Sequence, residues 1–416
     1  MEQESSMTLS PLINRPRAAN VLAQFGVDAL VLADPLNIYH ATGFWPLTLE
    51  MGQLGTTVAV VPADGALPVI LITGAFLYYF QDIGALPADG PVRAIVYTMP
   101  GENGEPAPPP FFRPADGGVP DPFERAARAA TLDAIGGRPT HIDATSALRD
   151  ALHEIGEEAR LAVDGFVPEA MLGPDFHYRP AEPLLRRIRM IKSPTEIELM
   201  RAAARHNADA ARAAVASARV GDSYDSLRRA FFAETGLRGG QPAFLQIDSN
   251  AYAHRDGIIR KGRAFSIDAV GRYSRYHGDF GRTVFVGEPD PILRRAIEAA
   301  INANRAVSEQ LRPGLHYSDV MRIGKEACAA VDRALVTPAS PHSVGLFHTD
   351  EAFRDDMPIF AKADHLIEAN MILSIDLPVL QTDMGGTVHL EDLWLVTAEG
   401  CEPLNDTAEP ILQIGC

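Results

Sequence analysis

The first third of the chain alternates between helical and strand-like spacing of its apolar residues. Residues 18–44 fit a helix, then an apolar strand at Ala29–Ala33, then a turn at Asp34-Pro35. Residues 56–73 fit two strands, because two short apolar runs flank a turn rich in Gly, Pro and Asp. The pattern predicts two further helices and a short strand, at about Pro122–Ile135, Ser146–Ile155 and Ala159–Gly165. We therefore expect a mixed α/β region.

The pattern changes after residues 173–184, where clustered Gly and Pro indicate a boundary. A long helix begins at Ser193, which can cap it, while Pro194 suits its first turn and Glu196 completes a capping box. Further helices are predicted at Tyr224–Thr235, Pro291–Leu311 and Tyr317–Leu335. Strands are predicted around Phe265, Val284, Ile372, His389 and Leu395. Because 416 residues exceed one hydrophobic core, we expect two domains of the α/β (α+β) class, residues 1–180 and 184–416.

Charge and composition narrow the classes of partner. The chain has 37 basic and 54 acidic residues, and its net charge of −17 disfavours nucleic acid and anionic membranes as partners. The one basic stretch, Leu184–Lys192, is better explained as a link between domains or the approach to a helix. No apolar run reaches the roughly 18 residues of a membrane span, and the first ten residues lack the features of a signal peptide. With three scattered cysteines and no CxxC pair, the sequence predicts a cytoplasmic protein without a thiolate zinc site.

Five polar residues interrupt apolar, strand-like settings in the second half of the chain: Asp268, Asp279, His342, Asp376 and Glu391. The tripeptide Ser-Ile-Asp occurs twice, ending at Asp268 and at Asp376, and each time a second carboxylate follows a Gly-containing connection. Two hairpins of this kind would direct four carboxylates to one point. Because clustered, partly buried carboxylates cannot all ionise without a cation, the pattern predicts one or two divalent metal ions, with His342 as a nitrogen donor. A single aspartate at a strand end is ordinarily a turn former, so the prediction depends on the repetition.

These motifs resemble those of the pita-bread metallohydrolases of peptidase family M24, which include methionine aminopeptidase, aminopeptidase P, prolidase and creatinase. The resemblance rests on several stretches in family order: RMIKSPTEIELMRAAA, NAYAHRDG, FSIDAVGRYSRYHGDFGRT, PHSVGLFHTDE, and IEANMILSIDLP followed by GGTVHLEDLWLVTAEG. Residues 14 to about 180, notably DPLNIYHATGF, are similar to the creatinase-type N-terminal domain of the family. The resemblance implies a C-terminal pita-bread fold with pseudo-two-fold halves, a smaller α/β N-terminal domain, and a homodimer.

The resemblance also implies roles for individual residues. His254 and His348 match two histidines that contact the substrate and the tetrahedral intermediate, and His389 lies at a position of the substrate pocket. Asp376 matches the general base as well as a metal ligand. The implied cofactor is one or two divalent ions, with manganese expected and iron, cobalt or zinc as alternatives. The positions that match the metal ligands of the family are Asp268, Asp279, His342, Asp376 and Glu391.

Departures from the family pattern affect the expected reaction. Asp376 stands where the peptidases have glutamate, and a side chain shorter by one methylene group reaches roughly 1.5 Å less far. His389 replaces an arginine, and Pro341 and Ser343 replace the glycines around the matching histidine ligand. We expect a metal-dependent hydrolase of short peptides or amides, similar to Xaa-Pro dipeptidase and aminopeptidase P. The alternatives are a creatinase-like hydrolase or lyase acting on a small zwitterion, and a binding module without catalysis.

Overall fold

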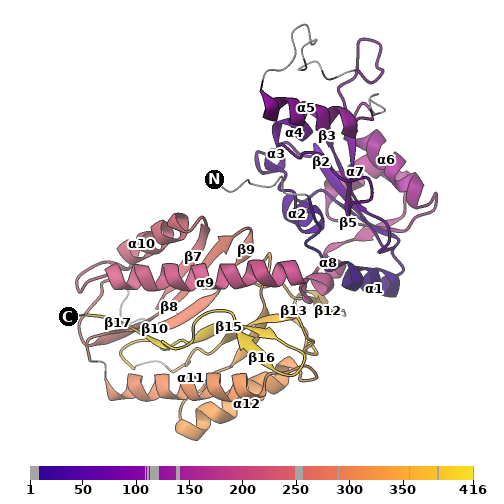
Figure 1. The fold of residues 1–416 in the computed structure, drawn as a ribbon. Coiled ribbons are helices and arrows are strands. Elements are labelled where there is room, and N and C mark those ends of the chain that lie inside the picture. Colours follow the sequence, from indigo (N-terminus) through magenta and orange to yellow (C-terminus); the bar gives the residue numbers. More distant parts are fainter. Residues whose placement is uncertain are drawn as a thin grey trace. The chain divides into compact units, whose positions relative to one another are not determined.

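The structure is a computed structural model, and it describes residues 9–107, 109, 112, 121–136, 141–248, 256–288, 290–355, 357–381 and 384–415. It divides into two compact units, residues 1–188 and 189–416, in agreement with the predicted fold class of two domains, whereas the bounds 1–180 and 184–416 stay a prediction. Each unit is built on a large sheet of its own (Figure 1). Among the helices that the structure describes, none is long and apolar enough to cross a membrane.

Unit 1 is a mixed α/β unit. Its elements are α1 (Arg15–Phe25), β1 (Ala29–Leu32), α2 (Pro35–Thr42), α3 (Leu47–Glu50), β2 (Thr57–Pro62), β3 (Val69–Gly74), α4 (Ala75–Phe80), β4 (Val92–Tyr97), α5 (Pro122–Ala134), α6 (Ala144–Ile155), β5 (Leu161–Val163), α7 (Phe166–Leu172), the 3-10 helix η1 (Gly173–Asp175), β6 (Tyr178–Pro180) and α8 (Glu182–Arg189). The strand order is β4-β3-β2-β1-β5-β6. The two pairings of β2 are antiparallel and the other three are parallel, so the sheet is mixed.

Both faces of the unit 1 sheet are buried, because alternate residues of its strands enter two separate apolar cores. Leu30 and Leu32 of β1 pack in one core with α1 and α2, whereas Ala29 and Val31 pack in the other with α6. Strands covered on both faces have nearly continuous apolar sequences, which explains the run at residues 57–62.

The turn that the sequence predicted at Asp34-Pro35 is wrong, because these residues begin α2. The Asp34 carboxylate accepts hydrogen bonds from the backbone N–H groups of Leu36 and Asn37, and Pro35 occupies the first helical position. An aspartate N-cap followed by proline is a favourable helix start, so this dipeptide begins a helix instead of forming a turn.

Unit 2 contains a nine-stranded sheet and four long helices. Its elements are α9 (Pro194–Ser217), α10 (Tyr224–Leu237), β7 (Gln241–Ile247), β8 (Arg263–Tyr273), β9 (Tyr276–His277), β10 (Phe280–Val286), α11 (Pro291–Gln310), α12 (Tyr317–Val331), β11 (Ser340–Ser343), β12 (Phe353–Arg354), β13 (Met357–Lys362), β14 (Ile372–Asp376), β15 (Glu391–Val396), β16 (Cys401–Pro403) and β17 (Ile411–Ile414). The main strand path is β11-β14-β15-β10-β8-β7, and every pairing along it is antiparallel.

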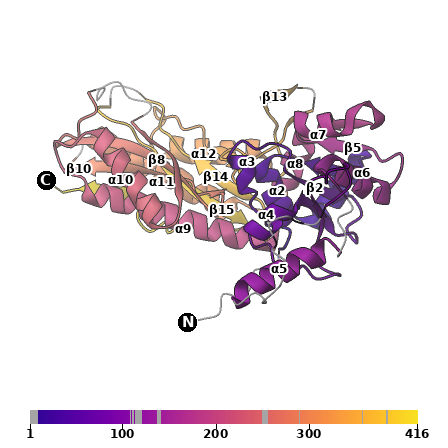
Figure 2. The ribbon, with the colours of Figure 1, turned by 90° about the horizontal axis from the view of Figure 1, so that it is seen from above.

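The order of elements repeats once within unit 2. Two helices precede three strands of the main path, first as α9, α10, β7, β8 and β10, and then as α11, α12, β11, β14 and β15. β10 and β15 are neighbours in the middle of the path, β8 and β14 flank them, and β7 and β11 lie at its ends. Figures 1 and 2 show α9 and α10 along one half of the sheet and α11 and α12 along the other, each pair with its own core. The predicted pita-bread fold with two similar halves is confirmed.

The long helix α9 begins as the sequence predicted. The Ser193 hydroxyl accepts a hydrogen bond from the Glu196 N–H at 3.2 Å, and the Glu196 carboxylate accepts one from the Ser193 N–H at 2.9 Å. The strand predicted around His389 is wrong, because β15 begins only at Glu391. Instead of pairing with a neighbouring strand, the His389 N–H donates to the Thr283 hydroxyl, which donates to the His389 carbonyl.

Candidate metal centre

A row of facing residues crosses the middle of the unit 2 sheet on four neighbouring strands. Asp268 of β8 lies opposite Gly281 of β10, Gly281 lies opposite Glu391 of β15, and Glu391 lies opposite Asp376 of β14. Residues that face one another across antiparallel strands project their side chains from the same side of the sheet. The two Ser-Ile-Asp segments therefore hold corresponding positions in the two halves, and their carboxylates converge with that of Glu391.

Asp279 and His342 complete the group. Asp279 comes directly before β10, and His342 lies on β11, beside β14. The His342 Nε2 atom is 3.5 Å from Asp279 Oδ2 and 3.6 Å from both Asp376 Oδ2 and Glu391 Oε1. Donor atoms of His342, Asp376 and Glu391 lie within 4.8 Å of one another, and so do those of Asp268, Asp279 and Glu391. Donor atoms of Asp279, His342 and His348 form a third such group, so the structure brings the five predicted ligands together with His348 beside them.

The group is largely buried, and its members have few hydrogen bonds. Asp279, Glu391 and His342 are 0%, 1% and 3% exposed. Among the described residues, Asp268 Oδ1, both carboxylate oxygens of Asp279 and both ring nitrogens of His342 lack a hydrogen-bond partner. Because burying a polar atom without a partner is costly, atoms placed in this way are expected to bind something other than the protein itself.

The carboxylates strongly influence one another's protonation. Burial and the neighbouring Glu391 charge raise the pKa of Asp268 to about 7 and that of Asp376 to about 6, and they hold the pKa of Asp279 well above its ordinary value. Burial opposes ionisation of Glu391 too, but the two adjacent imidazoles outweigh it and keep its pKa well below the ordinary value. Without a cation, protons must therefore compensate part of this negative charge.

A divalent cation fits this set of donors. The atoms without hydrogen-bond partners among the described residues, on Asp268, Asp279 and His342, lie close to the Glu391 carboxylate, which accepts a hydrogen bond from the Ser374 hydroxyl at 2.7 Å. Oxygen-rich sets with an imidazole suit manganese, iron, cobalt or zinc, and no cysteine belongs to the group.

Of the two predicted catalytic histidines, His254 lies outside the described residues. His348 stands at the edge of the group, because its side chain is 33% exposed and its Nε2 atom lies 3.3 Å from Asp279 Oδ2. The His348 ring packs against the rings of Phe244 and His342, which fix its orientation. This position leaves the His348 side chain accessible from solvent beside the buried carboxylates.

His389 reaches the group from the connection before β15. Its Nε2 atom lies 3.0 Å from Glu391 Oε2 and 3.5 Å from Asp376 Oδ1, and its side chain is 12% exposed. Burial disfavours the charged form of His389, but the Glu391 and Asp376 carboxylates outweigh this effect and raise its pKa to about 9. The imidazole therefore lies among the carboxylates.

Arg282 and Asp392 form a buried ion pair next to the row, and the sequence did not predict it. Arg282 donates to Asp392 Oδ1 at 2.7 Å, and both side chains are fully buried. The Arg282 guanidinium also donates to the carbonyl oxygens of Gly281 and Glu391, each at 2.8 Å. Since alternate residues of a strand point to opposite faces, the pair lies on the side of the sheet away from the row. Its only trace in the sequence is that each charged residue directly follows a row residue.

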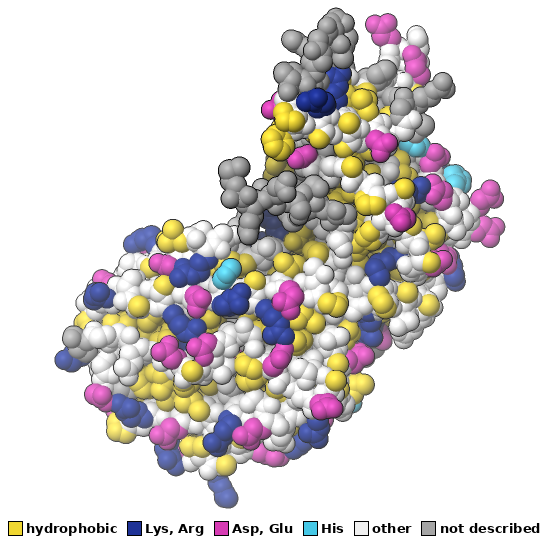
Figure 3. All heavy atoms as spheres, viewed as in Figure 1, with side chains coloured by type: hydrophobic (Ala, Val, Ile, Leu, Met, Phe, Trp, Pro, Cys, Tyr) yellow, Lys and Arg dark blue, Asp and Glu magenta, His cyan; other side chains and the backbone are white. Residues whose placement is uncertain are grey.

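Ser343, one of the residues that depart from the family pattern, belongs to another buried group of polar side chains. Lys192 Nζ donates to Ser343 Oγ at 2.9 Å, and Glu351 Oε2 accepts a hydrogen bond from the Ser343 N–H at 2.9 Å. Arg189 pairs with Asp350 at 2.7 Å, and both side chains are buried. Two cations of the predicted basic stretch are therefore buried. On the face drawn in Figure 3, basic and acidic side chains are interspersed over the region of α9.

Comparison with known proteins places these features in a family. Residues 198–398 match the sequence model of metallopeptidase family M24. Unit 2 belongs to metallopeptidase family M24. The family implies divalent metal ions, and every candidate ligand group found among the described residues lies in the M24 unit.

Proteins similar to this chain include peptidases. The probable dipeptidase PepE of Mycobacterium tuberculosis is 27% identical over 244 residues, which cover 56% of this chain and 63% of PepE. The alignment thus spans less than two thirds of that relative. The Xaa-Pro dipeptidase of Pyrococcus horikoshii is 23% identical over 275 residues, covering 63% of this chain and 76% of the relative. A crystal structure of a dipeptidase from Pyrococcus horikoshii has a TM-score of 0.67 at 18% identity over 96% of this chain and 99% of that one, which shows the prolidase-like fold.

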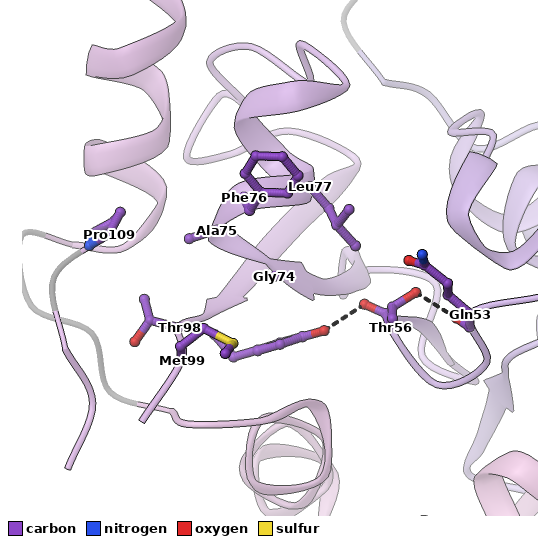
Figure 4. A pocket seen from close by; sticks show the side chains of 10 residues that line it. Gln53, Thr56, Gly74, Ala75, Phe76, Leu77, Thr98, Met99 and Pro109 are labelled. Atoms are coloured by element: carbon purple, nitrogen blue, oxygen red, sulfur yellow. Dashed lines mark hydrogen bonds between the residues drawn. The ribbon is translucent and has the colours of Figure 1, made fainter. Parts of the chain in front are cut away.

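A cavity in unit 1 is unrelated to the M24 ligand groups. It has a volume of about 410 Å³. At one end the Tyr97 hydroxyl donates to the Thr56 carbonyl oxygen at 2.9 Å, and the Thr56 hydroxyl donates to the Gln53 carbonyl oxygen at 2.9 Å. The remaining wall is mostly apolar (Figure 4), and the lining residues are Gln53, Thr56, Gly74, Ala75, Phe76, Leu77, Tyr97, Thr98, Met99 and Pro109.

Proposed function

We propose that this protein is a metal-dependent peptidase that hydrolyses short peptides, with Xaa-Pro dipeptides as the first candidate substrates. The observation that carries the proposal is the buried group of four carboxylates and one imidazole in an M24 unit, in which the donor atoms of Asp279 and His342 lack hydrogen-bond partners among the described residues. The names of the aligned relatives, Xaa-Pro dipeptidase and probable dipeptidase, support this choice of substrate class.

The five residues of the group would hold one or two divalent ions. When bound, the ions would polarise the scissile carbonyl group and lower the pKa of the attacking water molecule. The carboxylate-rich donor set makes manganese the first candidate, with iron, cobalt and zinc as alternatives. The proposed ligands are Asp268, Asp279, His342, Asp376 and Glu391.

Other side chains would transfer protons and stabilise charge. The Asp376 side chain is 30% exposed, so it can accept a proton from the attacking water and return it to the leaving amine. His348 lies at the accessible edge of the group and can donate a hydrogen bond to the carbonyl oxygen as negative charge develops there. His254 is proposed for a similar task on the family resemblance alone.

The proposal is tested by metal analysis and turnover of the purified full chain. Protein stripped of metal and reloaded with manganese, iron, cobalt or zinc is assayed against Xaa-Pro and other dipeptides. We expect bound metal and turnover in the wild type, and loss of both in Glu391→Ala. The control is His206→Gln on α9, a histidine that packs on Tyr273 and belongs to no ligand group. A wild-type protein that binds none of these metals would contradict the proposal.

A second candidate function is hydrolysis or lysis of a bond in a small, non-peptide zwitterion. It is favoured by Asp376 and His389, because the first is shorter than the glutamate of the peptidases and the second brings an imidazole among the carboxylates. Small amides and betaine-like compounds belong in the same assay panel. Turnover of these compounds without turnover of any dipeptide would favour the second candidate.

We also propose that the protein is a cytoplasmic homodimer, as the resemblance to the family implies. Light scattering on the purified chain measures its mass in solution. A mass close to twice 44.9 kDa is expected, whereas a mass of one chain would contradict the dimer.

A further inference from the structure

We infer that His389 is itself a metal ligand, so that Glu391 would stand between two imidazole ligands. This inference rests on the proposed metal centre and extends it, because it adds a sixth ligand and changes the expected preference for metals. It also gives His389 a different role from that of a residue lining the substrate pocket.

The two oxygens of Glu391 each face an imidazole. Oε1 lies 3.6 Å from the Nε2 atom of His342, and Oε2 lies 3.0 Å from the Nε2 atom of His389. Donor atoms bound to one ion lie roughly 3 to 3.5 Å apart, since each is about 2.0–2.2 Å from the ion. The separations of His389 Nε2 from Glu391 Oε2 and from Asp376 Oδ1, 3.0 and 3.5 Å, agree with this range.

Gly281 provides the space that the His389 ring occupies. It is the one member of the row without a side chain, and it lies between Asp268 and Glu391. A Cβ atom at position 281 would lie 2.1 Å from His389 Cδ2 and 2.3 Å from its Nε2 atom, too close for any real contact. The imidazole therefore fills the position that a side chain of the row would take, between two carboxylates.

This position brings a second imidazole to the same two carboxylates that His342 approaches. His342 Nε2 lies near Asp376 Oδ2 and Glu391 Oε1, whereas His389 Nε2 lies near the other oxygen of each carboxylate, Asp376 Oδ1 and Glu391 Oε2. Thr283 holds the backbone of His389 through hydrogen bonds of 3.0 Å on both its N–H and its carbonyl group, so the ring enters from a fixed point. A second imidazole shifts the preference of the centre from manganese towards iron, cobalt and zinc.

The experiment counts the imidazoles that bind the metal and measures its affinity. Full-length protein is stripped with a chelator and titrated with cobalt(II), which gives the affinity from visible absorption and the number of bound imidazoles from X-ray absorption. The variants are His389→Ala, His389→Arg, which places a cation without a ligating nitrogen beside Glu391, and Gly281→Ala, which displaces the ring. His206→Gln is the control, and circular dichroism verifies that each variant is folded.

We expect two imidazoles bound to the metal in the wild type and one in each His389 variant. The cobalt affinity of these variants should fall by about 10- to 100-fold or more, because even residues that only hydrogen-bond to metal ligands contribute that much to affinity. Gly281→Ala should also have one bound imidazole instead of two. If Gly281→Ala does not fold, the two His389 variants alone test whether His389 binds the metal. A wild-type centre with one imidazole, or unchanged affinity in His389→Ala, would overturn the inference while leaving the proposed function intact. A wild-type protein that binds no cobalt, manganese, iron or zinc would overturn both.

Discussion

Arg282 and Asp392 form a fully buried ion pair, 2.7 Å apart, directly behind the row residues Gly281 and Glu391. Removing one partner of such a pair leaves a buried charge without compensation. We therefore expect Arg282→Met to lower the free energy of unfolding of unit 2 by about 3–5 kcal/mol, measured by urea denaturation. The double variant Arg282→Met/Asp392→Leu should lose less than the two single variants together.

The matched control for this pair is the exposed ion pair of Arg229 and Asp225 on α10, whose side chains are 70% and 63% exposed. Exposed pairs at this spacing contribute only about 0.3–0.5 kcal/mol, so Arg229→Met should have little effect. Equal losses in Arg229→Met and Arg282→Met would contradict a structural role of the buried pair.

Replacement of Asp279 should change stability in opposite directions with and without metal. Its carboxylate is fully buried among other carboxylates, and neither oxygen has a hydrogen-bond partner among the described residues. Asp279→Asn removes a repelled charge, so the metal-free protein should gain about 1 kcal/mol. The wild type should gain about 4 kcal/mol when metal is present at 1,000 times its dissociation constant, and the variant far less.

Thermal unfolding with a chelator and with added manganese measures both effects of Asp279→Asn. Asp209→Asn on α9 is the control, because its side chain is 51% exposed and it should alter stability by less than about 0.5 kcal/mol. A variant that is as strongly stabilised by metal as the wild type would show that Asp279 is not a ligand.

His348→Gln should impair catalysis without loss of metal. The side chain is partly exposed beside Asp279, where it can stabilise charge that develops on the substrate. Loss of one such donor typically lowers kcat by about 100- to 1,000-fold. Steady-state kinetics and metal analysis on the same preparation separate the two effects. Metal content that falls together with kcat would instead make His348 a ligand.

Lys192 should contribute a rise in stability with pH between about 8 and 10.5. Burial lowers the pKa of its ammonium group from 10.5 to about 8, although Asp350 and Glu196 favour the charged form. Between pH 8 and 10.5 the unfolded chain binds a proton that the folded chain does not, so the free energy of unfolding rises with pH. The contribution is on the order of 3 kcal/mol.

Urea denaturation at pH 7.5, 9 and 10 compares the wild type with Lys192→Met. The methionine has no titrating group, so the stability of the variant should rise less across this range. The same slope in both proteins would mean that the pKa of Lys192 is not lowered in the folded state.

The sequence could predict which kinds of side chain gather in the metal centre, because the pattern around Ser-Ile-Asp is repeated. The corresponding strands β8 and β14 hold Asp268 and Asp376 at equivalent places, and the two antiparallel hairpins predicted from this repetition are present. The capping box at the start of α9 could also be predicted from the sequence, because it involves two residues only three positions apart.

The sequence could not predict the contacts around His389, because they depend on the register between strands that are distant in the chain. Nothing local indicates that Gly281 faces both Asp268 and Glu391, or that His389 fills the resulting space. The run around His389 has the composition of a strand, but a hydroxyl group of β10 takes the backbone contacts that a strand neighbour would need. Long-range contacts of this kind leave no periodic pattern.

The repeated halves of unit 2 also determine when a metal centre can exist during biosynthesis. Asp268 and Asp279 belong to the first half, whereas His342, Asp376 and Glu391 belong to the second. A nascent chain that has completed only β10 carries two of the five proposed ligands and lacks β11, β14 and β15, where the other three lie. A centre that uses all five proposed ligands would therefore form only after both halves are translated and β15 has joined β10.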